Sequence, residues 1–173
     1  SVVKTPTSNP AAWLLEILTS PTHKASQVDD SEIDLDAFGA LYTYCETNSL
    51  AVDMVLNEGD TKESILSIIS ELCFSLLYRN IYGEISIAID ETKANAIALF
   101  NTQNVISFSN TKSLARRVDG LKVSYTSRDA GYNQSSYLIM RPGVTRTADS
   151  IIQDINVSGI VEYEHIVKFA RRL

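Results

Sequence analysis

The feature that most constrains the fold is a change of hydrophobic period within residues 61–90, TKESILSIISELCFSLLYRNIYGEISIAID. In the first half of this stretch, apolar residues recur three and four positions apart, which is the spacing of one helix face. From residue 77 onward they alternate, which is the spacing of a strand. The helical positions are Ile65, Ile68, Ile69, Leu72, Cys73 and Leu76. The sequence therefore predicts a helix that runs directly into a β-hairpin.

Both parts of this unit carry local signals. Asp60, followed three residues later by Glu63, is typical of a capping box, so we expect Asp60 to cap the helix. The hairpin turn is expected near residues 80–83. The apolar positions of the second strand are Ile85, Ile87 and Ile89. We expect this side of the hairpin to pack on the helix and the other side to meet water or a partner.

Two further helices are predicted before this unit. In NPAAWLLEILTSP, we expect Asn9 to cap a helix whose first residue is Pro10. In LDAFGALYTYCETNS, we expect Asp34 or Asp36 to be the cap. The apolar faces of the two helices consist of Trp13, Leu14, Ile17, Leu18, Leu35, Phe38, Leu41, Tyr42 and Cys45.

The remaining pattern predicts mainly strands. Residues 50–60, LAVDMVLNEGD, alternate in polarity and are expected to form a strand that ends in a turn. Further strands are expected in NVISFS, RVDGLKVSYTS, SSYLIMR and SIIQDINVSG, and a last helix in IVEYEHIVKFARRL. Because strands and helices do not alternate regularly, the prediction is an α+β fold with helices packed on small, mostly antiparallel sheets.

The order of elements suggests three units. Residues 1–50 form a helical segment, residues 51–142 form an α+β unit with the hairpin and the following strands, and residues 143–173 supply a strand and a helix of a further, truncated unit. The chain begins with serine and stops inside an amphipathic helix that has no cap. We therefore expect it to be an excised piece of a longer protein.

Composition excludes some classes of function. Of the 173 residues, 45% are hydrophobic, as expected for a folded protein with a buried core. The net charge of −6 argues against nucleic acid and against an anionic membrane surface as partners. No apolar run is long enough to predict membrane insertion, and the start lacks the apolar core of a secretion signal. Cys45 and Cys73 are interpreted as buried free thiols in preference to a disulfide.

No motif predicts catalysis or a metal. The acidic run at residues 29–36 fails a calcium-loop template, because Phe38 and Cys45 stand where oxygen ligands are needed. His23 and His165 have no further ligand at metal-binding spacing, so we expect surface or capping roles for them. Neither a nucleophile elbow nor a glycine-rich phosphate loop is present. We therefore expect no catalytic, cofactor-binding or metal-binding residue, and a protein that is not an enzyme.

Five residues are candidates for a contact surface. Tyr132 and Tyr137, with Arg128, flank a loop that we expect to be exposed, and tyrosine and arginine are enriched in interface cores. Arg116 and Arg117 are candidates for pairing with acidic residues of another subunit. The alternatives are two tyrosines that pack on their own sheet and two arginines on a solvated edge. The sequence favours a binding or structural module.

Five segments, taken in order, resemble a known family. They are NPAAWLLEILTS, DSEIDLDAFGALYTYCE with its aromatic-cysteine pair, the helix-hairpin of residues 61–90, ARRVDGLKVSYTSRDAGYNQSSYLIM with Tyr125 after the valine strand, and INVSGIVEYEHIVKFARRL. Their order over residues 8–173 is similar to that of the central tail-tip proteins of long-tailed bacteriophages. This host-specificity or tip-attachment family is related to the baseplate hubs of contractile tails.

The resemblance implies a structural component of a phage or prophage tail tip. Hub domains of this family are α+β, assemble as a trimer in the full-length protein, close the tail tube and anchor other tail proteins. No catalytic residue carries over from the family, and we expect no cofactor, no nucleic-acid partner and no membrane insertion. The expected location is the tip of the virion tail, after synthesis of a prophage-encoded protein in the bacterial cytoplasm. The intact protein would also contact a host cell-surface receptor.

Two alternatives remain open. The first is a receptor-binding module of the tail that uses Arg128, Tyr132 and Tyr137 directly. The second is a tail-associated cell-wall hydrolase, which would need a carboxylate pair or a zinc site that the sequence does not offer.

Overall fold

A computed structural model describes residues 7–21, 27–56, 59–92, 105, 107, 109 and 117–173. The helices in these ranges are α1 (Pro10–Thr19), a 3-10 turn (Asp30–Glu32), α2 (Leu35–Thr47), α3 (Lys62–Leu72) and α4 (Tyr163–Ala170). The strands are β1 (Ser75–Arg79), β2 (Ile85–Ile89), β3 (Gly120–Ser127), β4 (Asn133–Met140) and β5 (Ile152–Asn156). Helices and two small sheets make an α+β fold, so the predicted class is confirmed.

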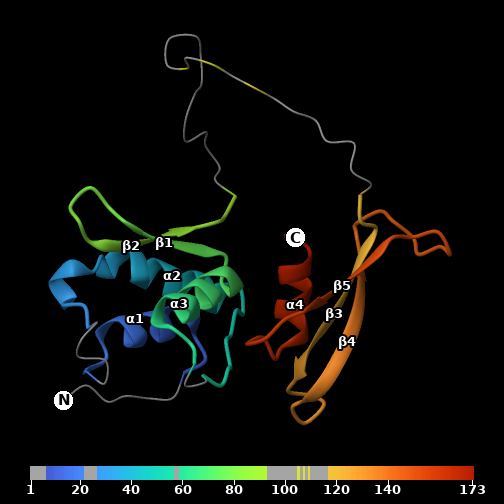
Figure 1. Ribbon diagram of the computed structural model, residues 1–173, viewed down its shortest axis with the longest axis horizontal. Helices are drawn as coiled ribbons and strands as arrows, with labels where there is room; N and C mark the ends of the chain where they lie inside the picture. The colour runs from blue at the N-terminus through green and yellow to red at the C-terminus, as the bar shows by residue number, and fades with distance from the viewer. Residues whose placement is uncertain are drawn as a thin grey trace.

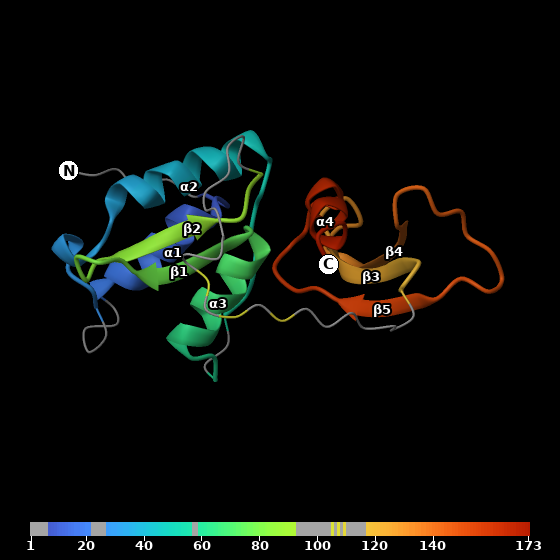
Figure 2. The ribbon, with the colours of Figure 1, turned by 90° about the horizontal axis from the view of Figure 1, so that it is seen from above.

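The elements form two groups with α4 between them. Helices α1, α2 and α3 pack together and carry the β1–β2 hairpin on one side (Figure 1). The sheet of β3, β4 and β5 lies at the other end of the molecule, and α4 lies between this sheet and the first group in both views (Figure 2). The buried apolar side chains of the two groups belong to one cluster, so the core is continuous through α4.

The first two helices begin as predicted. The Asn9 side chain accepts a hydrogen bond from Ala11 N at 3.0 Å, and Pro10 is the first helical residue of α1. Asp34, and not Asp36, caps α2. Its other carboxylate oxygen accepts a hydrogen bond from the Ser86 hydroxyl at 2.8 Å, which connects the start of α2 to the hairpin.

The predicted cap of α3 is wrong by one residue. Thr61, and not Asp60, is the N-cap, and its hydroxyl oxygen accepts a hydrogen bond from Ser64 N at 3.2 Å. Thr61 has the extended backbone conformation that an N-cap requires. Because Thr61 is itself a good capping residue, the helix begins after it, and the acidic residue lies one position before the cap.

The helix-to-hairpin transition is confirmed. β1 and β2 are antiparallel, with Leu77 opposite Ile87. Ile87 is buried, and Leu77, Ile85 and Ile89 pack against the core from the same side, as predicted. Leu76, which the helical pattern included, lies instead in β1 and is 66% exposed. The hairpin thus presents its alternating isoleucines to the helices.

The second sheet has the order β4-β3-β5. β3 and β4 are antiparallel and are joined by a tight turn at residues 128–132. β5 is parallel to β3, with Val123 opposite Ile155. Two of the three strand pairings are therefore antiparallel, consistent with the predicted sheets.

Residues 51–56 do not form the predicted strand. Val52 N donates a hydrogen bond to Ser8 O at 2.8 Å, whereas Asp53 N donates to Gly159 O at 2.9 Å. Successive residues therefore bond to two different segments, and no ladder forms. Val52 is fully buried and Val55 is 86% exposed. Burial along this segment is therefore irregular, although its sequence alternates in polarity. The strand predicted at residues 104–109 lies outside the described residues except for 105, 107 and 109.

The expectation of a surface or capping role for His165 is also wrong. Its side chain is fully buried where α4 meets the first group. Its Nε2 lies 2.8 Å from Leu72 O, and its Nδ1 lies 3.1 Å from Ala51 O and 3.4 Å from Ala51 N. Burial lowers the pKa of His165. Because a carbonyl oxygen can only accept, Nε2–H donates to Leu72 O, while Nδ1 faces the backbone of Ala51. The other histidine, His23, lies outside the described residues.

Aromatic and charged side chains complete this junction. Phe169 of α4 stacks on Phe74, with ring centroids 6.3 Å apart. The Arg172 guanidinium lies 3.9 Å from the Phe74 ring centroid and pairs with Asp90 at 3.3 Å. These contacts join the end of α4 to the hairpin.

Cys45 and Cys73 are buried free thiols, as predicted. Interaction with the Cys73 thiol, together with burial, raises the pKa of Cys45. Among the helices of the described ranges, none has the length and apolar character needed to cross a bilayer. The boundaries predicted after residues 50 and 142 remain predictions.

Candidate contact site

A group of tyrosines lies on the face of the second sheet that α4 covers. The Tyr137 ring lies 6.1 Å from the Tyr125 ring and 4.7 Å from the Tyr163 ring, between centroids. Tyr125 is buried, and burial raises its pKa, whereas Tyr137 and Tyr163 are 46% and 45% exposed. We call Tyr132, Tyr137 and Tyr163 the tyrosine surface.

Tyr132 is held by backbone geometry. It lies in the β3–β4 turn with φ of 62°, and its N donates a hydrogen bond to Ser127 O at 2.8 Å. A non-glycine residue in the left-handed region is uncommon and is held there by its surroundings. The side chain is 60% exposed, so the turn displays an aromatic ring to solvent.

Arg128, one of the predicted contact residues, already has partners within the chain. Its guanidinium pairs with Asp53 of the first group and with Glu162 just before α4. A hydrogen bond with Tyr132, followed by the nearby carboxylates, raises the pKa of Arg128. Ser8 Oγ in turn donates to Asp53 at 2.6 Å. The structure thus places Arg128 in an ion-pair network that joins the two groups.

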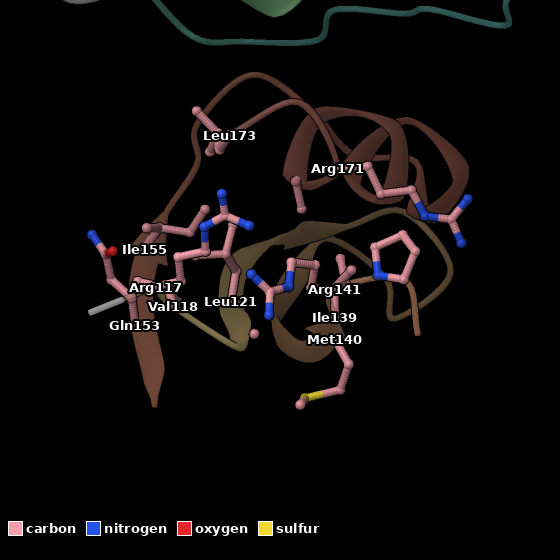
Figure 3. A pocket seen from close by; sticks show the side chains of 13 residues that line it. Arg117, Val118, Leu121, Ile139, Met140, Arg141, Gln153, Ile155, Arg171 and Leu173 are labelled. Carbon is pink, nitrogen blue, oxygen red and sulfur yellow. The ribbon is translucent and has the colours of Figure 1, made fainter. Parts of the chain in front are cut away.

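Arg117, a second predicted contact residue, lines a hollow of about 660 Å³ at the other end of the same sheet. The lining consists of Arg117, Val118, Gly120, Leu121, Ile139, Met140, Arg141, Pro142, Gln153, Ile155, Ala170, Arg171 and Leu173. We call this site the arginine hollow. Figure 3 shows Arg117 and Arg141 extending into it, whereas Arg171 points away from its centre.

The strand register explains the floor of the hollow. Leu121 lies opposite Ile139 on β4 and opposite Gln153 on β5. Ile155, two residues further along β5, is on the same face as Gln153. The C-terminal end of α4 covers only part of this face, where Ala170 is buried. The floor is therefore apolar, half-buried and flanked by cationic side chains.

The charges of the hollow are poorly compensated. Arg141 has a distant ion pair with Asp119, at 3.8 Å. The Asp119 carboxylate also accepts a hydrogen bond from Ile151 N at 2.9 Å. Within the part of the chain that the structure describes, Arg117 and Arg171 have no ion-pair partner, and no acidic side chain lines the hollow.

These surfaces provide groups for binding. Tyrosine rings offer stacking area and hydroxyl groups, and guanidinium groups bind carboxylates in a bidentate manner. Over the described ranges, no group of three or more histidine, cysteine, aspartate or glutamate side chains could hold a metal ion.

Sequence reasoning found only some of these residues. It identified Arg117, Tyr132 and Tyr137. The structure places Tyr132 in the β3–β4 turn, Tyr137 opposite Val123 in the middle of the sheet, and Arg117 in the hollow at the other end. Arg116 lies outside the described residues. Sequence reasoning missed Tyr163 and Arg141. Their signal was their position, with Tyr163 the first residue of α4 and Arg141 directly after β4, where side chains can flank a sheet face.

Comparisons with known protein families and with curated proteins do not indicate a role for these surfaces. No family model matches the chain, and no curated protein has a matching sequence.

Proposed function

We propose that this chain is a structural component of a phage or prophage tail tip or baseplate hub and acts through contacts with other proteins. The observation that supports a contact role is the tyrosine surface: the rings of Tyr137 and Tyr163 are 46% and 45% exposed and pack next to each other beside the buried Tyr125, and Tyr132 is 60% exposed in the β3–β4 turn. Aromatic side chains that combine a fixed position with exposure are typical of interface cores. The tail assignment itself is supported by the ordered resemblance in the sequence.

Within this proposal the partners are other tail proteins, and the full-length protein is a homotrimer at the end of the tail tube. The protein is made in the bacterial cytoplasm and ends in the virion, without a cofactor, a nucleic-acid partner, membrane insertion or a catalytic role. A clear lytic band on a peptidoglycan zymogram would contradict the non-catalytic assignment.

Location in the particle is the direct test. Antibodies against this chain, used for immunogold labelling of purified particles from the encoding bacterium, are expected to mark the tip of the tail. Preimmune serum serves as the control. Label on the capsid, or particles without any label while the chain remains in the cell lysate, would overturn the tail assignment.

The tyrosine surface can be tested in the same system. The Tyr132→Ala and Tyr137→Ala double variant is expected to reduce incorporation of the protein into tails. Tyr82→Ala, at an 81% exposed tyrosine in the β1–β2 turn, is a matched control that removes a ring from another surface. Incorporation equal to that of the wild type would exclude the tyrosine surface from assembly.

A receptor-binding role is the second candidate, favoured by Tyr132 at the tip of an exposed turn. The two roles give different results with the same double variant. If the tyrosines bind a receptor, tails assemble normally but adsorb poorly to host cells. If they bind a tail protein, assembly fails before adsorption can be measured.

A further inference from the structure

We propose that the arginine hollow binds an extended, acidic and apolar peptide segment of a partner protein. This site is separate from the tyrosine surface and does not depend on the tail assignment. The proposal commits to a segment in which carboxylate side chains alternate with large apolar ones. The argument rests on the floor, the charges and the shape of the hollow.

The floor requires an apolar occupant. Leu121, Ile139 and Ile155 are half-buried on the sheet face that α4 covers, beyond the point where the helix ends. Leu173 is 70% exposed beside them. Apolar side chains inserted here would remove this surface from water, at roughly 25 cal/mol per Å².

The charges require the occupant to be anionic. Arg117 and Arg141 extend into the hollow from two sides, as Figure 3 shows, and the lining contains no carboxylate side chain. The protein as a whole carries a net charge of −6, so a cationic hollow is a local exception. Guanidinium groups over an apolar floor are complementary to a carboxylate next to an apolar group.

The shape favours a peptide over a small ion. Small-ligand sites usually enclose most of the ligand surface. Here Arg117, Arg141, Pro142, Gln153 and Arg171 are all exposed, so the rim is open. An extended segment can fill the floor with one or two side chains and continue across the rim, where its carboxylates reach the arginines. This gives it contacts that a small anion lacks.

The binding test uses the folded 173-residue chain and short fluorescein-labelled peptides. In the first peptide leucine and glutamate alternate, in the second serine replaces leucine, and in the third lysine replaces glutamate. Fluorescence anisotropy measures the affinity of each. The first peptide is expected to bind at least about tenfold more tightly than the other two, because both the apolar and the charged contacts contribute.

Variants locate the site. Replacing both arginines, Arg117→Gln and Arg141→Gln, is expected to weaken binding of the leucine–glutamate peptide by about tenfold or more, since hydrogen bonds to charged groups are lost. Arg146→Gln is the matched control, because Arg146 is exposed and lines a separate hollow on the opposite face of the same sheet. Methyl NMR signals of Leu121, Ile139 and Ile155 are expected to shift when the peptide is added.

Several outcomes would overturn the proposal. One is an equal loss of affinity in the Arg146→Gln control and the double variant, and another is the absence of binding by the first peptide. Dodecanoate that binds the wild type at least as tightly as the peptide would make the hollow a fatty-acid site instead of a peptide site. If the double variant has an altered thermal midpoint, Ile139→Ser with the methyl NMR readout tests the floor independently. A failed peptide test leaves the tail assignment intact, because particle labelling tests that assignment.

Discussion

Polar side chains near the two ends of α4 differ: near the N-terminal end a polar ring is buried and hydrogen-bonded, and near the C-terminal end charged side chains are exposed. In the first turn of the helix, the fully buried His165 has backbone partners for both ring nitrogens. Beyond the C-terminal end, Arg117 and Arg171 line an open hollow and have no ion-pair partner among the described residues. The first arrangement joins the two groups of elements. The second arrangement leaves cationic side chains at an open surface, where a partner can reach them.

The largest effect is expected from breaking the buried end. His165→Ala removes a fully buried ring and leaves Leu72 O without its donor. We expect the free energy of unfolding to fall by about 2–4 kcal/mol, from the cavity and the unpaired carbonyl together. Urea denaturation measures this loss. Glu164→Gln, on the adjacent residue, is the control and should change stability little; a loss below about 1 kcal/mol for His165→Ala would show that the junction is not a stability centre.

Gly159 tests how closely the two groups pack. It has φ of 91°, and a Cβ there would lie 2.9 Å from the Leu72 Cδ1 atom. Gly159→Ala is therefore expected to cost about 2–3 kcal/mol, from backbone strain and overpacking. Gly143 has a similar φ of 80° but nothing within 4 Å, so Gly143→Ala shows the strain alone. Equal losses in thermal denaturation would contradict tight packing at Gly159.

Lowering the pH should weaken the same junction. Burial keeps the folded-state pKa of His165 below its unfolded value of 6.5. The unfolded chain therefore binds a proton first, so the stabilising contribution is complete above pH 6.5 and is lost as pH falls toward the folded pKa. Urea titrations of the wild type between pH 7.5 and pH 5, values spanning this window, should show a decline that His165→Gln reduces. Identical slopes would show that His165 does not titrate on unfolding.

A smaller effect is expected from the exposed ion pairs between the groups. Arg128 and its partners Asp53 and Glu162 have side chains that are 30–43% exposed. Solvent screening therefore limits Arg128→Ala to a loss of at most about 1 kcal/mol, which should shrink further in high salt. Arg146→Ala is the control. A loss that does not depend on salt would assign the effect to packing and not to charge.

The smallest effect is expected at the hollow. Arg117→Gln should change the free energy of unfolding by no more than about 0.5 kcal/mol, because its guanidinium has no ion-pair partner among the described residues. Calorimetry against the wild type measures this. A large destabilisation would mean that the arginine supports the fold, and the contrast between the two ends of α4 would disappear.

The sequence-based predictions were correct where the interacting residues are near one another in the sequence, and they failed more often where these residues are far apart. The Asn9 cap and the hairpin with Ile87 on its inner side were predicted correctly, because their signals lie within a few residues. The cap of α3 was displaced by one residue because Asp60 and Thr61 are both competent caps. The strand predicted around Val52 failed because alternation alone does not supply a neighbouring strand.

The candidate site was predictable only in part. Tyr132 and Tyr137 were found because they flank a turn, and their exposure agrees with that position. The partners of Arg128 were not predictable, because Asp53 lies 75 residues away in the sequence. The hollow around Arg117 required the parallel pairing of β5 with β3, which no local pattern indicates.

By itself, the sequence determined the local elements and their apolar faces, because helix caps, turns and hydrophobic periods act between residues that are near in the chain. Tertiary structure decided which polar groups became internal. His165 bonds to Ala51 across 114 residues, whereas Arg117 is left at the rim of an open hollow. The physical reason is that the desolvation and the pairing of a polar side chain depend on the groups that pack around it in space. The local sequence does not distinguish a polar residue that becomes buried from one that stays exposed.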